Sequence, residues 1–282
     1  MVIKIGQSGC SEDLIQSLNK IGIDNLMSFD DVQEFNNNFD KTYKLRLDHE
    51  RKILEDKISA LSEKYSDLGN ISNSDVFILK KIYIKIRLFF LNRKIQNLRK
   101  NFNNIITKKV NHLMKARYFL DENINTYHGA IGEEKLIDEL EKLPNSFFLL
   151  NNVCVEFPKA VYWSKHGEYV RSAQIDHVVV GPPGVYAIET KNWTINTYMD
   201  AERSPHHQAS RAGFALWLSL KRKFRFKNYS VSSILVTTRK LPRRNYDYVK
   251  QLIINDIVSY FLGRNEKLNQ RQISKIAGYL SP

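Results

Sequence analysis

The feature that most constrains the fold is an apolar run at residues 173–193, AQIDHVVVGPPGVYAIETKNW. Two stretches rich in Val and Ile flank the turn-forming sequence Gly-Pro-Pro-Gly at 181–184. The run therefore predicts two antiparallel strands joined by a short loop. If Val180 pairs with Val185 across this loop, the register of the whole hairpin follows.

Three charged side chains interrupt this apolar hairpin. In the predicted register Asp176 faces Glu189, and Lys191 lies on the same side, since side chains two residues apart share a face of a strand. Like charges directly opposite each other are destabilising, and charged side chains are seldom buried unless they are paired or bind metal. The pattern predicts a divalent cation between Asp176 and Glu189, with Lys191 beside it. The simpler interpretation is that both acids are exposed strand ends and that Lys191 only pairs with one of them.

Length and composition favour one large domain, or a medium domain with an appendage, in a chain of 282 residues. The two cysteines, Cys10 and Cys154, form no CxxC or Cys/His cluster, which argues for a reducing compartment and against a zinc site. The first residues lack the apolar segment of a secretory signal. No stretch has the uncharged apolar length of a membrane span. We expect a soluble, cytoplasmic protein.

Residues 76–120 carry nearly all of the excess positive charge. The net charge of the chain is +13, and this segment holds twelve Lys or Arg and no acid. The preceding segment, residues 24–75, has the opposite balance, with twelve acids against seven bases. The charge is therefore a property of one local surface and not of the whole protein.

Leucines at every seventh position indicate that this charged region is helical. They stand at Leu47, Leu54, Leu61 and Leu68. Such a heptad period is typical of a coiled coil or a long helical hairpin, which we call the arm. A segment containing Gly and Asn at 69–75 predicts a stop and the start of a second long helix. Apolar residues alternate with period two between 82 and 88, so a strand there stays an alternative.

The basic part of the arm has three interpretations. The acidic first helix can pack along the basic second helix as an antiparallel hairpin. The Lys and Arg side chains can bind a phosphate backbone. The arm can also lie on an anionic membrane surface, as Phe89 and Phe90 beside Arg87 and Arg93 suggest. We rank these interpretations in that order, and dimerisation through the arm is a further expectation.

A compact α/β domain is predicted at residues 123–282, after a helical region at 1–122. Its first helix begins near residue 128, and Glu133 lies on its buried side because it precedes Ile137 by four residues. A later helix begins at Pro205 and carries Gln208 on a face of small residues. Apolar segments at 147–155, 173–193, 232–238 and 249–254 are the expected strands. The order predicts a mixed sheet flanked by helices.

Four groups of residues together resemble a known family. They are Gly129-x-x-Gly132-Glu133, QIDHVVVGP at 174–182, GVYAIETKNW at 184–193, and Pro205-x-x-Gln208. This combination resembles the nuclease-related domain (NERD), a member of the restriction-endonuclease-like PD-(D/E)XK superfamily. The resemblance covers roughly residues 125–281 and does not include the arm.

The resemblance implies a restriction-endonuclease-like fold and a deoxyribonuclease that depends on Mg²⁺ or Mn²⁺. Asp176 and Glu189 would hold the ion, with Glu133 assisting from the first helix. Lys191 would position or polarise the attacking water, and Gln208 would steady the site. The expected partner is DNA, and defence against foreign DNA is the context by analogy. The alternative is a DNA-binding or membrane-surface scaffold without catalysis.

Overall fold

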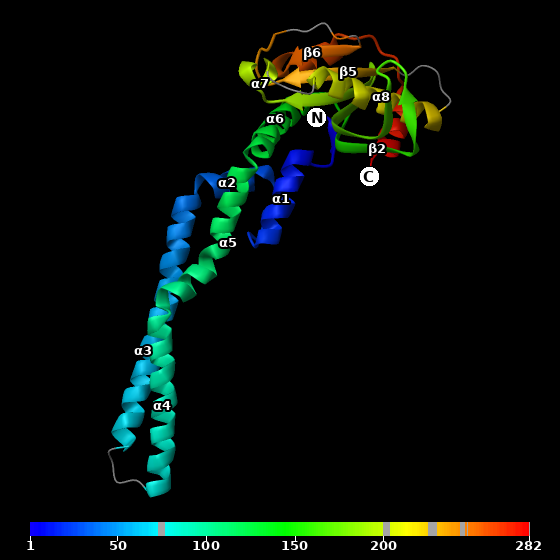
Figure 1. Ribbon diagram of the computed structural model, residues 1–282. Coiled ribbons are helices and arrows are strands. Elements are labelled where there is room, and N and C mark those ends of the chain that lie inside the picture. Colours follow the sequence, from blue (N-terminus) through cyan, green and yellow to red (C-terminus); the bar gives the residue numbers. More distant parts are fainter. Residues whose placement is uncertain (73–76, 200–203, 225–229, 243–245, 247, 282) are drawn as a thin grey trace. The chain divides into compact units, whose positions relative to one another are not determined.

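The predicted hairpin forms the middle of a six-stranded mixed sheet (Figure 1). In order across the sheet the strands are β1 (Ile3–Ile5), β2 (Phe148–Trp163), β3 (Glu168–Gly181), β4 (Gly184–Lys191), β5 (Val231–Thr237) and β6 (Val249–Ile253). Neighbours are antiparallel from β2 to β4 and parallel at both ends of the sheet. Val180 pairs with Val185, and the ladder continues one pair further to Gly181 and Gly184. The predicted register and the α/β class are confirmed.

Helices cover both faces of this sheet. They are α6 (Ile124–Leu140) and α9 (Ile257–Leu262) on one face, and α8 (Pro205–Lys223) and α10 (Gln270–Leu280) on the other. The short helix α7 (Ile195–Met199) follows β4, and a 3-10 turn (Ile254–Asp256) precedes α9. Helix α8 begins at Pro205 after Ser204, as predicted, because proline at the first position is preorganised for a helix.

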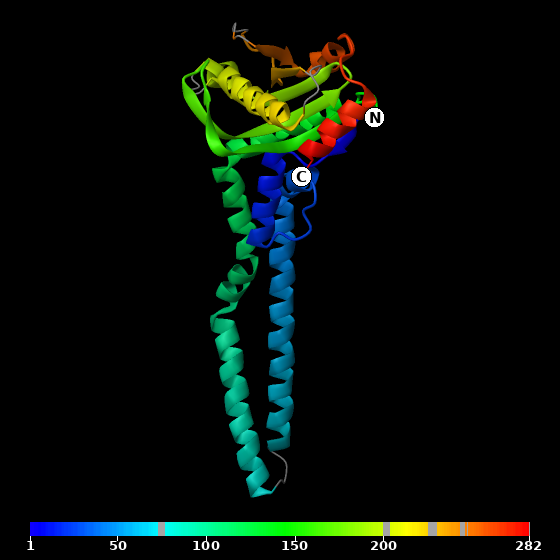
Figure 2. The ribbon, with the colours of Figure 1, turned by 90° about the vertical axis from the view of Figure 1, so that its right-hand side faces the viewer.

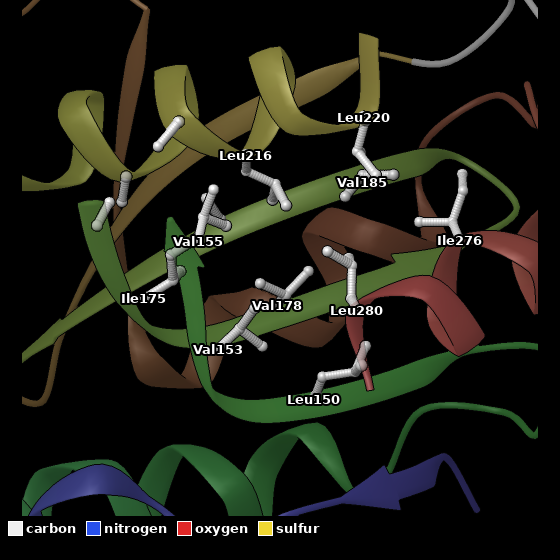
Figure 3. Packing of buried hydrophobic residues seen from close by; sticks show 14 of the residues in the cluster. Leu150, Val153, Val155, Ile175, Val178, Val185, Leu216, Leu220, Ile276 and Leu280 are labelled. Carbon is white, nitrogen blue, oxygen red and sulfur yellow. The ribbon is translucent and has the colours of Figure 1, made fainter. Parts of the chain in front are cut away.

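Two apolar layers hold the sheet between its helices. The layer under α8 and α10 includes Val178 and Val185 of the hairpin, and Figure 3 shows Leu220 of α8 next to Val185 and Leu216 pointing toward the sheet. The opposite layer joins the strands to α6 and α9. Since both faces are covered, the central strands are apolar along nearly their whole length.

The described residues of the helical region form four helices after the N-terminal helix α1 (Gly9–Ile21). They are α2 (Phe29–Asn37), α3 (Phe39–Ser72), α4 (Ile78–Lys100) and α5 (Phe102–Glu122). Figures 1 and 2 both show α3 and α4 running side by side as the predicted hairpin. The strand alternative at 82–88 is wrong, because these residues lie in α4. The helix is interrupted at Asn101, so α4 and α5 are separate helices.

The structure, a computed structural model, describes residues 1–72, 77–199, 204–224, 230–242, 246 and 248–281. The predicted turn at 69–75 therefore lies partly outside the described residues. The chain divides into two compact units, Ser17–Glu122 and a second unit that joins Met1–Gln16 to Asn123–Pro282. The first sixteen residues belong with the sheet because β1 pairs with β2.

Candidate active site

Asp176 stands at the point where the β3–β4 ladder ends. The last regular pair is His177 with Ile188, and Asp176 is the next residue of β3. Its Oδ2 accepts a hydrogen bond of 2.8 Å from the backbone N–H of Thr190. The Asp176 carboxylate thus takes the place of a backbone carbonyl as the partner of the Thr190 N–H. The regular pairing of β3 with β4 stops here.

The alternation of β2 and β3 changes at the same level of the sheet. On β3, Ile175 and Val178 both belong to the apolar layer under α8, although they are three residues apart. On β2, Leu150 and Val153 show the same odd spacing, and Asn152 between them has a φ of +53°. Both strands therefore twist locally beside Asp176, and this irregularity separates its side chain from the apolar layer.

Glu189 and Lys191 form an ion pair next to Asp176. The Lys191 Nζ lies 2.6 Å from the Glu189 Oε1. Glu189 is only 7% exposed, so the interpretation of both acids as exposed strand ends does not hold for it. Lys191 does pair with one of the acids, as that same interpretation expected, and its ammonium also lies 5.5 Å from the ring centroid of Trp193. Glu189 therefore already has a cationic partner in the fold.

Glu133 reaches the same region from α6, on the other side of the hairpin. It is 6% exposed, which confirms that it lies on the buried side of its helix. Its Oε2 accepts a hydrogen bond of 3.3 Å from the backbone N–H of Cys10 in α1. The approach of α6 depends on Gly132, where a Cβ would lie 2.8 Å from the Cβ of Asn192. Only glycine lets the helix come this close to the end of β4.

Gln208 completes the set from α8. Its Oε1 is buried and accepts no hydrogen bond from any residue that the structure describes. A buried carbonyl oxygen without a hydrogen-bond donor destabilises the fold. Such an atom commonly binds a water molecule or an ion, or has a functional role. Gln208 lines one pocket of about 1020 Å³ together with Glu133, Asp176 and Glu189. Lys191, the ion-pair partner of Glu189, is not among the residues that line this pocket.

Burial raises the pKa of two carboxylates in this pocket, Asp176 and Glu133. Burial raises the pKa of Asp176 well above its ordinary value, and the charges of Glu189 and Glu133 raise it further. Burial also raises the pKa of Glu133, against the lowering effect of its hydrogen bonds from Cys10. The charge of Lys191 lowers the pKa of Asp176 and of Glu133, but it does not cancel the rise. A cation placed among these carboxylates would relieve the remaining repulsion.

Lys191 remains a cation in this environment. Burial alone would lower the pKa of Lys191, but the Glu189 and Asp176 carboxylates more than compensate and raise it. The ammonium therefore stays protonated at neutral pH and has no lone pair with which to accept a proton. It can orient a water molecule or offset negative charge, and it cannot act as a general base.

The described residues contain no group of three or more His, Cys, Asp or Glu side chains gathered closely enough to hold a metal ion. The three carboxylates therefore share a pocket without forming a ready-made set of three ligands. The donors present still fit Mg²⁺ or Mn²⁺, because such ions commonly take one or two carboxylates and complete their shell with water and phosphate. The orphaned oxygen of Gln208 and the raised pKa of Asp176 are the observations that support this fit.

Several residues that shape the pocket were not assigned a role from the sequence. Asn192 donates from Nδ2 to the His128 carbonyl, at 2.9 Å, and accepts from the Thr238 hydroxyl, at 2.6 Å. It thereby ties the first turns of α6 to the end of β5. Cys10 contributes its backbone N–H to Glu133, and burial raises the pKa of its thiol, followed by the charge of Glu133. The raised pKa favours the neutral thiol of Cys10 over the thiolate, which is the nucleophilic form.

Aromatic and basic side chains line the rim of the pocket. They include Tyr169, His207, Arg211 and Tyr246. His207 and Arg211 each lie 3.6 Å from a carboxylate oxygen of Glu168, on the β2–β3 hairpin. Exposed rings beside a guanidinium are groups on which nucleic-acid bases stack. The neighbouring His206 points elsewhere, toward Gln251, so the two adjacent histidines do not face one ion.

The fold and site define an α/β domain with a carboxylate-lined pocket at the open end of a central hairpin. Comparison with known families agrees: residues 128–238 match the family described as Nuclease-related domain (NERD). The chain therefore contains a nuclease-related domain, and the matched range includes Glu133, Asp176, Glu189, Lys191 and Gln208. It ends at β5, before α9 and α10.

Similarity to individual proteins is limited. An uncharacterized protein of Bacillus anthracis is 34% identical over 82 residues, which are 29% of this chain and 34% of that protein. The chain thus spans about a third of the length of this relative. No solved structure matches the chain.

Proposed function

We propose that the protein is a nuclease that hydrolyses phosphodiester bonds of DNA with the help of Mg²⁺ or Mn²⁺. The observation that carries the proposal is the half-buried Asp176 carboxylate, whose pKa is raised by desolvation and by its acidic neighbours, in a pocket that also contains the orphaned oxygen of Gln208. A fold keeps such an uncompensated group only at a cost, and groups of this kind cluster at functional sites. The match to the nuclease-related domain also supports a nuclease.

Asp176 and Glu189 would hold the ion, with Glu133 close enough to add its charge. Such an ion lowers the pKa of a bound water and offsets the charge that develops on phosphate. Lys191, fixed by its ion pair with Glu189, would orient the attacking water or stabilise the developing charge. Gln208 would turn its free carbonyl oxygen toward a donor, such as a water molecule, in the loaded pocket.

The rim of the pocket favours a nucleic acid over a small phosphate ester. Tyr169 is 69% exposed and stands next to Tyr162 on the neighbouring strand, with ring centroids 5.2 Å apart. Arg211 and His207 provide positive charge at the same opening when His207 is protonated. A substrate with both bases and phosphates would use the rings and the cations together.

The test is cleavage by the purified chain. We expect plasmid or linear DNA to be cut in Mn²⁺ or Mg²⁺ and left intact in EDTA. Asp176→Asn and Lys191→Ala should each reduce the rate at least a hundredfold, on the order of the loss of one electrostatic catalytic group. Asp13→Asn is the matched control, because Asp13 lines the same pocket but is exposed to solvent. Equal cutting by Asp176→Asn and the wild type would remove Asp176 from the mechanism.

A DNA-binding scaffold without catalysis is the second candidate. It is favoured by the finding that the described carboxylates do not gather as a three-ligand cluster. In that case DNA should bind equally well with Mn²⁺ and with EDTA, and Asp176→Asn should leave binding unchanged. DNA binding that is strengthened by Ca²⁺ and lost in Asp176→Asn, without any cutting in Ca²⁺, would speak for the nuclease instead.

A further inference from the structure

Helix α4 has a second apolar face whose side chains are exposed among the described residues of its unit. We call the following seven residues its outer face: Ile78, Leu79, Ile82, Tyr83, Ile86, Phe89 and Phe90. Each of these side chains is between 52% and 75% exposed. At about 100° per residue they fall within one continuous sector of roughly 140° along the helix. A contiguous exposed apolar patch on a helix is typical of an interaction site.

The opposite face of α4 is the one that packs against α3. Ile84 and Ile95 are 3% and 5% exposed, and Leu88 and Leu91 are partly buried between them. These residues point away from the outer face by about half a helical turn. The period-two pattern at 82–88 is thereby explained, because Ile82 and Ile86 belong to one face and Ile84 and Leu88 to the other.

Cationic side chains border the outer face on both edges. Lys80, Arg87 and Lys94 recur every seven residues and form a row along one edge, while Lys85 lies at the other. The Arg87 guanidinium lies 5.7 Å from the ring centroid of Tyr83, so the charge and the apolar sector are contiguous. No acid interrupts residues 76–120. An apolar sector flanked only by cations is the pattern of a helix that lies in the interface of an anionic membrane.

Other occupants fit this surface less well. A second copy of the same face would bring the rows of Lys and Arg together, with no acid on either helix to compensate. A DNA backbone would use the cations but leave Ile78, Ile82 and Ile86 in water. A membrane span is excluded for the described residues, because none of their helices has the length and apolarity that a bilayer crossing needs.

We propose that the outer face of α4 binds the surface of a bilayer rich in anionic phospholipids. The apolar side chains enter the boundary between headgroups and acyl chains, and the flanking cations lie at the level of the lipid phosphates. Helix α3 remains on the side of α4 away from the lipid. This interaction holds whether or not the nuclease-related domain cleaves DNA.

The test is flotation of the full chain with vesicles. One set contains phosphatidylcholine alone, and the other contains about one third phosphatidylserine. The variant Ile82→Gln/Ile86→Gln/Phe89→Gln removes much of the apolar face but keeps every cation and a good helix former at each position. The matched control, Leu45→Gln/Ile53→Gln, changes exposed apolar residues of α3 that are 61% and 43% exposed.

We expect the wild type to float with phosphatidylserine vesicles, and to bind them at least tenfold more weakly at high salt. The partition coefficient of the triple variant should fall on the order of a hundredfold, because three large apolar side chains that would enter the lipid are replaced by polar ones. The α3 control should float like the wild type, and circular dichroism should show equal helicity in all three proteins.

Three results would overturn the proposal. The first is flotation of the triple variant as complete as that of the wild type. The second is a wild type that stays at the bottom of the gradient but sediments as a dimer, while the triple variant sediments as a monomer. That outcome would assign the outer face of α4 to self-association. If the wild type does not float and the triple variant loses DNA binding, the outer face of α4 binds nucleic acid instead.

Discussion

Replacing Asp176 by asparagine removes the negative charge, which destabilises the folded state, but keeps an oxygen that can accept a hydrogen bond. Because the pKa of Asp176 is raised in the folded protein, the folded state holds its proton more tightly than the unfolded state. The contribution of this group to stability is therefore fully present below the unfolded pKa and is lost as the pH rises through the folded pKa. Asparagine has no charge to lose, and its Oδ1 can still accept the Thr190 N–H at 2.8 Å.

The expected magnitude at neutral pH follows from what the amide can gain. Its N–H₂ group can donate to the Glu189 or Glu133 carboxylate, and a hydrogen bond to a charged group contributes about 1.5–3 kcal/mol. One kcal/mol shifts the melting temperature of a unit of this size by roughly 2–4 °C. We expect the metal-free Asp176→Asn variant to melt several degrees above the wild type at neutral pH and at nearly the same temperature in acid.

Divalent metal should reverse this order. A ligand present at about one hundred times its Kd stabilises the folded state by about 2.7 kcal/mol. The wild type should therefore gain roughly 5–10 °C in saturating Mn²⁺ or Ca²⁺. Asp176→Asn should gain almost nothing, because its amide oxygen is a far weaker ligand than a carboxylate.

Tryptophan fluorescence is the appropriate assay, because all three tryptophans belong to the unit that contains the sheet. They are Trp163, Trp193 and Trp217. Melts would be recorded near pH 5 and near pH 8, with EDTA and with each metal. An unchanged metal response in Asp176→Asn would refute the metal site. A metal-free variant that melts below the wild type at neutral pH would refute the conclusion that Asp176 is an uncompensated charge.

The remaining predictions concern contacts around the site and in the arm. Gly132→Ala would place a Cβ 2.8 Å from the Cβ of Asn192, so it should move Glu133 and weaken the metal-induced rise in melting temperature. Gly181→Ala would place a Cβ 2.1 Å from the buried ring of Phe147, and we expect it to cost roughly 1–3 kcal/mol of stability in tryptophan-monitored urea unfolding. Glu50→Gln should destabilise the helical unit in circular-dichroism melts, since Glu50 is 5% exposed and paired with a lysine at 2.6 Å.

Each of these variants has an internal control. Gly278→Ala in α10 meets no atom within 4 Å and should leave the sheet unit as stable as before or slightly more stable. If Gly181→Ala behaves like Gly278→Ala, the turn is looser than the structure shows. The hydrogen bond from Lys109 lowers the pKa of Glu50, so the effect of Glu50→Gln should be present at neutral pH and vanish in acid. A constant effect at all pH values would contradict the ion pair.

The hairpin at 173–193 was predictable because its information is local. The apolar pattern and the Gly-Pro-Pro-Gly turn set the register, and the register brought Asp176 and Glu189 to neighbouring positions. The change of alternation at Asp176 was not predictable in this way. It depends on the positive φ of Asn152 in β2, a residue whose relation to Asp176 exists only after β2 and β3 have paired.

The contribution of the N-terminal residues was also hidden from the sequence. β1 has only three residues, and it forms because β2 offers a free parallel edge. This pairing brings α1 close enough for the Cys10 N–H to reach Glu133. A segment whose order comes from a partner far along the chain has no periodic signal of its own, so its role appears only with the tertiary structure.

Two features of the described residues carry a cost in the folded protein. At Asp176, carboxylates come together without enough positive charge to balance them. On α4, a whole face of large apolar side chains stays in water although the helix already has one packed face. If Asp176→Asn raises stability without metal, and polar residues on the outer face leave the hairpin intact, neither arrangement is needed for the fold. Sequences are locally consistent except where binding requires otherwise. The costs are of different kinds, one electrostatic and one hydrophobic, which agrees with the two different ligands proposed above, a cation at the pocket and a lipid surface at the helix.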